Sequence, residues 1–274
     1  MPHDAIYEVY AVRYAHYAPR RARENFLMAA APDAHAPDAH DIPMPFDYFV
    51  WAVIGGGKTI VVDTGFDAPT ASRRGRELLL PPRDGLLALG IDPAAVTDVV
   101  LTHLHYDHAG NHDLFPNATY WIQDREIAYA TGRHMCHPVL RLGYEADDAC
   151  AVVRKIFAGR VRCVDGAAEL CPGISLHHLG GHTKGMQCVR VRTRRGFVVL
   201  ASDATHFYAN LETGNPFPAL WHVGEALEGF ATLRRLATSE AHIIPGHDPL
   251  VMARYPAARP DLVGSIVRLD ADLR

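Results

Sequence analysis

The 274-residue sequence has few cysteines and no long apolar run. Its five cysteines are odd in number and irregularly spaced, which argues against a disulfide framework and favours a reducing compartment. A membrane-spanning helix needs a run of about 18 apolar residues, and the sequence has none. The first residues also lack the basic segment and apolar core of a signal peptide. We therefore expect a soluble, cytoplasmic protein with no membrane partner.

An excess of basic residues is also missing. The chain has 27 Lys and Arg against 31 Asp and Glu, a net charge of -4 with histidine neutral. Proteins that bind nucleic acid by neutralising phosphates show the opposite balance, so we expect no nucleic-acid partner. The same balance gives no reason to expect a strongly anionic substrate.

Two common catalytic motifs are absent. The triple glycine at 55–57 lies between two predicted strands and is not followed by a predicted helix, so it indicates a hairpin turn rather than a phosphate loop. No serine or cysteine lies in the strand–turn–helix context of a nucleophile elbow. Nothing in the sequence therefore indicates a side-chain nucleophile of that type.

The sequence instead places histidines and aspartates where predicted strands end. The stretch 102–108, Thr-His-Leu-His-Tyr-Asp-His, follows the apolar run 99–101 and has the spacing H-x-H-x-D-H. Two histidines two residues apart can converge on one ion, and zinc binds both imidazole and carboxylate. Three single residues further along also follow apolar runs. The predicted metal ligands are His103, His105, Asp107, His108, His182, Asp203 and His247.

These residues, in this order, resemble the pattern of the metallo-β-lactamase superfamily: H-x-H-x-D-H, then a distant His, Asp and His. The turn Asp63-Thr64-Gly65 matches as well, and the likeness covers roughly residues 47–250. Within that superfamily, the stretch 102–111 and the element 203–206 are most similar to the N-acyl-homoserine lactonases. The resemblance implies an α+β fold, a four-layer αβ/βα sandwich with the site along one edge between its halves. It also implies that Asp63 orients the ligand loop.

The resemblance further implies a dinuclear metal-dependent hydrolase with Asp203 bridging the ions. One ion would be held by His103, His105 and His182, and the other by Asp107, His108 and His247. A hydroxide shared by the ions would open a lactone ring, in an N-acyl-homoserine lactone or a similar lactone. We expect two zinc ions, with iron, manganese or cobalt as alternatives, because such shells accept each of them.

One position departs from the lactonases, which place a tyrosine three residues after the bridging aspartate. Here that residue is His206. An imidazole can donate a hydrogen bond as a phenol does, and can act as a general acid near neutral pH. His206 is therefore predicted to be catalytic together with Asp107, although a merely packed side chain explains it equally well. Tyr208 is an alternative for the missing tyrosine.

Other functions use the same ligands. A glyoxalase-II-like thioesterase would need basic groups for its substrate, for which Arg254, Arg259 and Arg268 are the C-terminal candidates. A β-lactamase and a mononuclear-iron oxidoreductase fit less well, and a non-catalytic metal- or ligand-binding protein is the alternative to an enzyme. The sequence also leaves open whether the protein forms a homodimer.

An apolar pocket would draw on Phe46, Phe49 and the tyrosines of the first strand, although such residues more often belong to the core. Those tyrosines are Tyr7, Tyr10 and Tyr14.

We expect one domain spanning 1–274. Proline density predicts a long loop over 15–46, and its repeated Ala-Pro-Asp-Ala-His, with His35 and His40, indicates low complexity rather than a metal arm. Residues 131–160 are predicted to form a helical insertion across the metal cleft. Predicted strands are 6–14, 48–54, 59–62, 98–101, 118–122, 161–164, 174–178, 186–191, 197–201 and 241–244. Predicted helices are 68–80, 86–89, 123–130 and 222–236.

Overall fold

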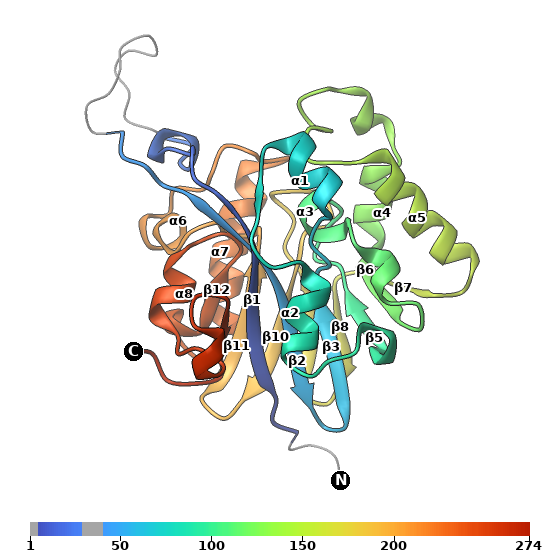
Figure 1. Ribbon diagram of the computed structural model, residues 1–274. Helices are drawn as coiled ribbons and strands as arrows, with labels where there is room; N and C mark the ends of the chain where they lie inside the picture. Colours follow the sequence, from blue (N-terminus) through green and yellow to red (C-terminus); the bar gives the residue numbers. More distant parts are fainter. Residues whose placement is uncertain (1–4, 29–40) are drawn as a thin grey trace.

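The computed structural model describes residues 5–28 and 41–274, and two β-sheets packed face to face form its centre (Figure 1). The first sheet has the strand order β13-β1-β2-β3-β5-β6-β7, with β4 paired to β1, and the second has the order β12-β11-β10-β9-β8. The repeated segment that contains His35 and His40 lies outside the described residues. Among the described residues, no helix is long and apolar enough to cross a membrane.

The strands have the following bounds: β1 Glu8–Tyr17, β2 Phe46–Gly55, β3 Lys58–Val62, β4 Glu77–Leu78, β5 Asp98–Val100, β6 Thr119–Gln123, β7 Val161–Val164, β8 Ala167–Cys171, β9 Ile174–His178, β10 Gln187–Thr193, β11 Gly196–Ser202, β12 Ile243–Pro245 and β13 Ile266–Arg268. The α-helices are α1 Ala68–Arg74, α2 Pro82–Ala88, α3 Tyr106–Ala109, α4 Asp124–Ala130, α5 Ala146–Phe157, α6 Tyr208–Thr213, α7 Val223–Leu236 and α8 Leu250–Arg254.

Apolar side chains on both faces of each sheet produce four layers. Between the sheets, Trp51 and Val62 of the first pack with Leu176 and Val198 of the second, all fully buried. The outer face of the first sheet is covered by α2, α4 and α5, and that of the second by α7. Strands buried on both faces are continuously apolar, as β2 is from Tyr48 to Ile54. The predicted α+β four-layer sandwich is confirmed.

The prediction of a helix over 68–80 is wrong beyond residue 74. Helix α1 ends at Gly75, which adopts the left-handed conformation (φ 62°) and donates its N–H to the carbonyl oxygens of Ala71 and Ser72. The chain then forms β4, which pairs with β1 at Ala15 and His16. A glycine with positive φ is the usual end of a helix, so the stop signal lay in the sequence before the prolines.

The insertion 131–160 is only partly helical. A short 3₁₀ helix spans Arg133–Cys136 and α5 spans Ala146–Phe157, with an irregular segment between them that contains Pro138 and Gly143. Helix α5 buries Val152 against the outer face of the first sheet and does not cross the cleft. The irregular segment, residues 139–143, is the part that lines the cavity described below.

The second half of the chain builds the second sheet from its strands β8 to β12, but two of its strands belong to the first sheet. Strand β7 extends the first sheet beside β6, and β13 returns to pair antiparallel with β1. Strands β8 and β13 and helices α6 and α8 were not predicted from the sequence. They are short, and β8 has no buried residue that would give it an alternating apolar pattern.

Candidate metal centre

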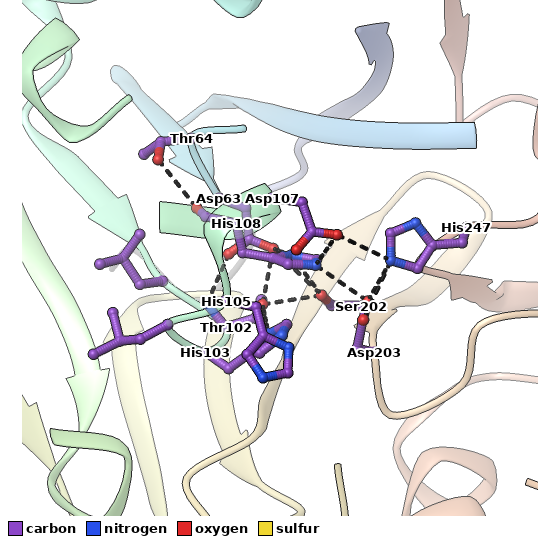
Figure 2. Close-up of polar contacts among 12 residues, drawn as sticks. Asp63, Thr64, Thr102, His103, His105, Asp107, His108, Ser202, Asp203 and His247 are labelled. Carbon is purple, nitrogen blue, oxygen red and sulfur yellow. Dashed lines mark hydrogen bonds and ion pairs between the residues drawn. The ribbon is translucent and has the colours of Figure 1, made fainter. Parts of the chain in front are cut away.

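The ligand loop begins where β5 ends. Strands β3 and β5 are parallel, so Asp63 and Thr102 emerge at the same edge of the first sheet. Asp63 accepts hydrogen bonds from the Thr102 N–H and hydroxyl, both at 2.8 Å, and also contacts His108 Nδ1 at 2.7 Å and the Ser202 hydroxyl at 3.3 Å (Figure 2). Asp63 has a positive φ of 60°, a conformation that aspartate tolerates better than most residues. A fully buried carboxylate thus fixes both ends of the loop.

The three distant residues come from the second sheet and its loops. Strands β11 and β12 are parallel, and Asp203 and His247 follow their ends. His182 lies in the loop between β9 and β10, after Gly180 and Gly181, whose φ values are 71° and 83°. A side chain at Gly181 would meet the backbone nitrogen of Ala226 at 2.6 Å, so this loop can lie close to α7 only with glycine there.

The structure brings all seven predicted ligands together at the edge between the sheets. Their donor atoms form groups within 4.8 Å, namely His103–His105–His182, His103–His108–Asp203 and Asp107–His108–His247. Asp203 lies between the two outer groups. Its carboxylate is 3.1 Å from His247 Nε2, 3.3 Å from His108 Nε2 and 3.4 Å from His182 Nε2. In Figure 2, Asp107 and His108 of α3 point toward Asp203 and His247, which follow β11 and β12.

Hydrogen bonds on the far side of each ring aim the imidazoles inward. Nδ1 of His108 contacts Asp63, that of His182 contacts the Ala219 carbonyl oxygen at 2.6 Å, and that of His247 contacts the Asp47 carbonyl oxygen at 2.9 Å. Because these oxygens only accept, each Nδ1 carries the proton, and each Nε2 lone pair faces the centre. His105 instead presents Nδ1, which is 2.9 Å from His182 Nε2.

The centre leaves buried polar atoms without partners. His103 Nε2, His108 Nε2 and Asp203 Oδ1 are buried and make no hydrogen bond with any residue that the structure describes. Buried polar atoms are nearly always satisfied, so several orphans that converge on one point indicate a missing ligand. Imidazole nitrogens and carboxylate oxygens are the donors that zinc and similar divalent ions take. The residues present therefore fit a metal site.

Burial sets the charge state of most of these groups. Burial, reinforced by neighbouring histidines, holds the pKa of His103 and His105 well below 6.5. Burial would also lower the pKa of His108, but the carboxylates of Asp203, Asp107 and Asp63 raise it well above 6.5. Burial would raise the pKa of Asp203, but the imidazoles of His247 and His108 bring it well below 3.8. In the metal-free centre His103 and His105 are thus neutral, whereas His108 holds a proton beside the ionised Asp203; a bound cation would take the place of that proton.

His206 belongs to the same cluster. It is buried, its Nε2 is 3.0 Å from Asp203 Oδ2, and its ring stacks on Phe217. His182, Asp203 and His206 form a further close group. Tyr208, the proposed substitute, does not line the cavity, because its ring packs between the sheets beneath the Arg254 guanidinium.

A cavity of about 250 Å³ opens onto the centre. Of the predicted pocket aromatics only Phe46 lines it, whereas Tyr7, Tyr10, Tyr14 and Phe49 do not. The aromatic lining comes instead from Tyr48, Tyr106, Tyr129 and Trp221. Tyr14 still supports the site, since its hydroxyl donates to the Asp107 carbonyl oxygen at 2.8 Å.

Glu126 joins three segments around the centre and was missed from the sequence. Its carboxylate accepts from the Leu104 and Gly185 N–H groups and from the Tyr144 and Thr183 hydroxyls, at 2.6 to 3.0 Å. It thereby ties the ligand loop to the His182 loop and to the insertion. No local motif marks Glu126, because its partners are distant in sequence.

The family model of the metallo-beta-lactamase superfamily matches residues 44–253. The chain belongs to this superfamily. A curated N-acyl homoserine lactonase from Bacillus sp is 29% identical over 165 residues, which are 60% of this chain and 60% of that relative's length.

Two solved structures share the fold of this chain. A quorum-quenching N-acyl homoserine lactone lactonase superposes with a TM-score of 0.71 at 21% identity, covering 89% of this chain and 92% of the other. An N-acyl homoserine lactone hydrolase, described with the product N-hexanoyl-L-homoserine bound at the catalytic metal center, gives 0.70 at 20% identity, covering 90% and 95%.

Proposed function

We propose that this protein is a dinuclear metal-dependent hydrolase that opens a lactone ring, with an N-acyl-homoserine lactone or a similar lactone as substrate. One observation carries the proposal: seven imidazole and carboxylate groups converge beneath a cavity, with their far sides anchored and several near-side atoms unpartnered. The lactonase names of the relative and of both structural neighbours support the choice of a lactone.

The ligand assignment follows the two outer groups. His103, His105 and His182 would hold one ion, Asp107, His108 and His247 the other, and Asp203 would lie between them. Two divalent ions here, zinc by preference, would supply Lewis acidity and a nucleophilic hydroxide at neutral pH. The hydrolysis adds water across the ring ester and converts the lactone into a hydroxy acid.

Of the three carboxylates, Asp107 is best placed to move protons. Asp63 does not line the cavity, and its oxygens are taken by Thr102 and His108. Asp203 lines the cavity but is surrounded by imidazoles. Asp107 also lines the cavity, so its carboxylate would accept the proton of the attacking water and return one to the alkoxide that leaves when the ring opens.

His206 contacts Asp203 directly, which favours a role in orienting that carboxylate. A role as proton donor to the substrate stays a prediction. The variant His206→Ala distinguishes these two roles from simple packing. If either role holds, kcat should decrease more than the content of bound metal. An equal loss of metal and activity would show that His206 only supports the metal ligands.

The three arginines predicted to contact glutathione do not support the thioesterase alternative. Arg254 lies over Tyr208, Arg259 pairs with Asp261, and Arg268 pairs with Asp270, so none of these predicted contacts for glutathione lines the cavity.

The deciding experiment measures hydrolysis on metal-loaded protein, with metal content determined on the same sample. The panel holds short- and long-chain acyl-homoserine lactones, γ- and δ-lactones, S-lactoylglutathione and nitrocefin. Preferred lactone opening with two metals bound, abolished by a chelator, is the expected result. Turnover of the thioester alone would move the protein to the glyoxalase-like alternative. No turnover of any compound would favour the non-catalytic alternative.

A further inference from the structure

Three arginines line the cavity, and their charges are not equally compensated. Arg74 donates to Glu145 Oε1 from Nε and Nη2, at 3.0 and 2.8 Å, and to the Leu142 carbonyl oxygen from Nη1. Arg20 and Arg76 make no ion pair with any carboxylate in the described parts of the chain, 5–28 and 41–274. The cavity therefore holds two positive charges that no direct ion pair with a described residue compensates.

Each of these two guanidinium groups is held in place but keeps one amino group without a hydrogen bond. Arg20 lies 3.8 Å over the Phe46 ring and donates to Asn25 Oδ1 and to the Glu24 carbonyl oxygen from Nε and Nη2. Arg76 donates to the Tyr106 hydroxyl and the Arg74 carbonyl oxygen from Nε and Nη1. Arg20 Nη1 and Arg76 Nη2 thus have no partner among residues 5–28 and 41–274.

These charges belong to one end of the cavity. The Phe46 ring that carries Arg20 stacks at 4.5 Å on His247, and Tyr106, the partner of Arg76, precedes Asp107. The arginine end is therefore next to the Asp107–His108–His247 group. At the other end of the cavity, the backbone N–H of Trp221 donates to the His182 carbonyl oxygen, and the apolar side chains of Leu140 and Leu220 complete the wall.

The half-buried guanidinium groups of Arg20 and Arg76 repel each other and lose part of their hydration. Both effects raise the free energy of the site when no anion is bound. In the metal-loaded protein the carboxylates of Asp107 and Asp203 would not offset this positive charge, because the charge of two divalent ions exceeds theirs. A guanidinium presents parallel N–H donors that match the two oxygens of a carboxylate. An anionic group on the substrate would satisfy the free amino groups and balance the charge.

We propose that Arg20 and Arg76 form a recognition site for a carboxylate carried by the substrate, in addition to the ester group that is hydrolysed. This inference rests on the proposed function and narrows it to lactones with a negatively charged substituent and an apolar remainder. It also revises the expectation from the net charge of -4, which gave no reason to look for an anionic substrate.

The test uses pairs of lactones that differ only in charge. One pair is N-succinyl-homoserine lactone and its terminal amide, with the charge at the acyl tip. The other is γ-butyrolactone-γ-carboxylate and the corresponding carboxamide, with the charge beside the ring. For the metal-loaded wild type, kcat/KM is expected to favour the carboxylate by about tenfold or more in at least one pair, the size of one charge-assisted hydrogen bond.

Arg20→Gln and Arg76→Gln should each remove most of that preference, whereas Arg76→Lys keeps the charge and should retain part of it. Arg73→Gln is the matched control, because Arg73 is an exposed arginine of α1 that does not line the cavity. Circular dichroism checks folding, and Arg76→Gln decides the matter if Arg20→Gln does not fold. Equal rates within both pairs, or a preference that survives both glutamine variants, would overturn the inference.

Calorimetric binding of the lactam analogues of the same pairs, which lack the ring ester, to metal-loaded protein separates this inference from the proposed function. If no lactone is hydrolysed, the proposed function fails. Tighter binding of the carboxylate that is lost in Arg20→Gln and Arg76→Gln would still establish the anion site. Equal binding of carboxylate and amide would refute it, whatever the hydrolysis assay shows.

Discussion

Replacing Asp63 by asparagine should weaken metal binding although Asp63 is not a predicted ligand. Asparagine has nearly the same shape and also tolerates a positive φ, so the turn at 60° is not disturbed. What changes is the hydrogen bonding, because one of the two acceptor oxygens becomes an NH₂ donor. That donor must face either the Thr102 N–H, where Oδ1 now lies, or the His108 Nδ1 and Thr102 hydroxyl, where Oδ2 lies.

Each orientation has a definite consequence. If the NH₂ faces the Thr102 N–H, a buried backbone donor loses its partner, which costs about 1–3 kcal/mol of stability. If the NH₂ faces His108, the imidazole must accept on Nδ1, and its proton moves to Nε2, the atom that points into the centre. Residues that orient metal ligands in this way typically contribute roughly 10- to 100-fold in metal affinity.

The assay is a competition titration of zinc against a chelator, with urea unfolding of the metal-free protein in parallel. Asp67→Asn is the control, because Asp67 is an exposed helix cap that accepts only from Thr70 N–H and does not contact the ligand loop. We expect a loss of affinity, of stability or of both for Asp63→Asn alone. Unchanged zinc affinity together with unchanged stability would refute the argument that Asp63 sets the His108 tautomer.

Three further predictions concern burial. Glu126→Gln places an NH₂ against the N–H of Leu104 or Gly185 and should destabilise the protein by about 1–3 kcal/mol in urea unfolding; the exposed Glu228→Gln should be neutral. Burial raises the pKa of Cys188 to about 12, so iodoacetamide and mass spectrometry should find native Cys188 unlabelled and the exposed Cys136 labelled; native labelling of Cys188 would contradict this. Burial also lowers the pKa of His103, His105, His182 and His206 below 6.5, so the metal-free folded state binds fewer protons than the unfolded chain. The urea midpoint of the metal-free protein should therefore decrease as the pH is lowered from 7.5 to 5.5, and His108, whose pKa is raised, should compensate only in part. A midpoint that increases over this range would show that the raised pKa of His108 dominates.

The sequence predicted the strands that are buried on both faces and the long amphipathic helix α7. Their apolar patterns are strong because most positions of β2, β3 and β11 pack on both sides. It failed for β8, a short edge strand without a buried residue, and for β13, which is short and pairs with a strand distant in sequence. Pairing of β13 with β1 joins residues about 255 positions apart, and no local pattern encodes such a contact.

The seven candidate ligands could be found from the sequence because their constraint is local. H-x-H-x-D-H lies within one turn, and the other three each follow a strand end, where loops gather at one edge of the layers. Glu126 and the oxygens behind the imidazoles could not be found in this way. The Ala219 and Asp47 groups that orient His182 and His247 are backbone carbonyl oxygens, so any residue type at those positions would supply them.

Selectivity has a different origin from the metal centre. The walls of the cavity come from the strand-to-loop segment around Arg20, the end of α1 and the irregular part of the insertion, none of which carries a motif. A chain with net charge -4 can still present a locally positive cavity, because among the described residues three arginines but only two acidic residues, Asp107 and Asp203, line it. The charge that a substrate meets is therefore set by which side chains remain uncompensated within the cavity. For this reason charge-matched lactone pairs, rather than chain length alone, are the informative substrates for this protein.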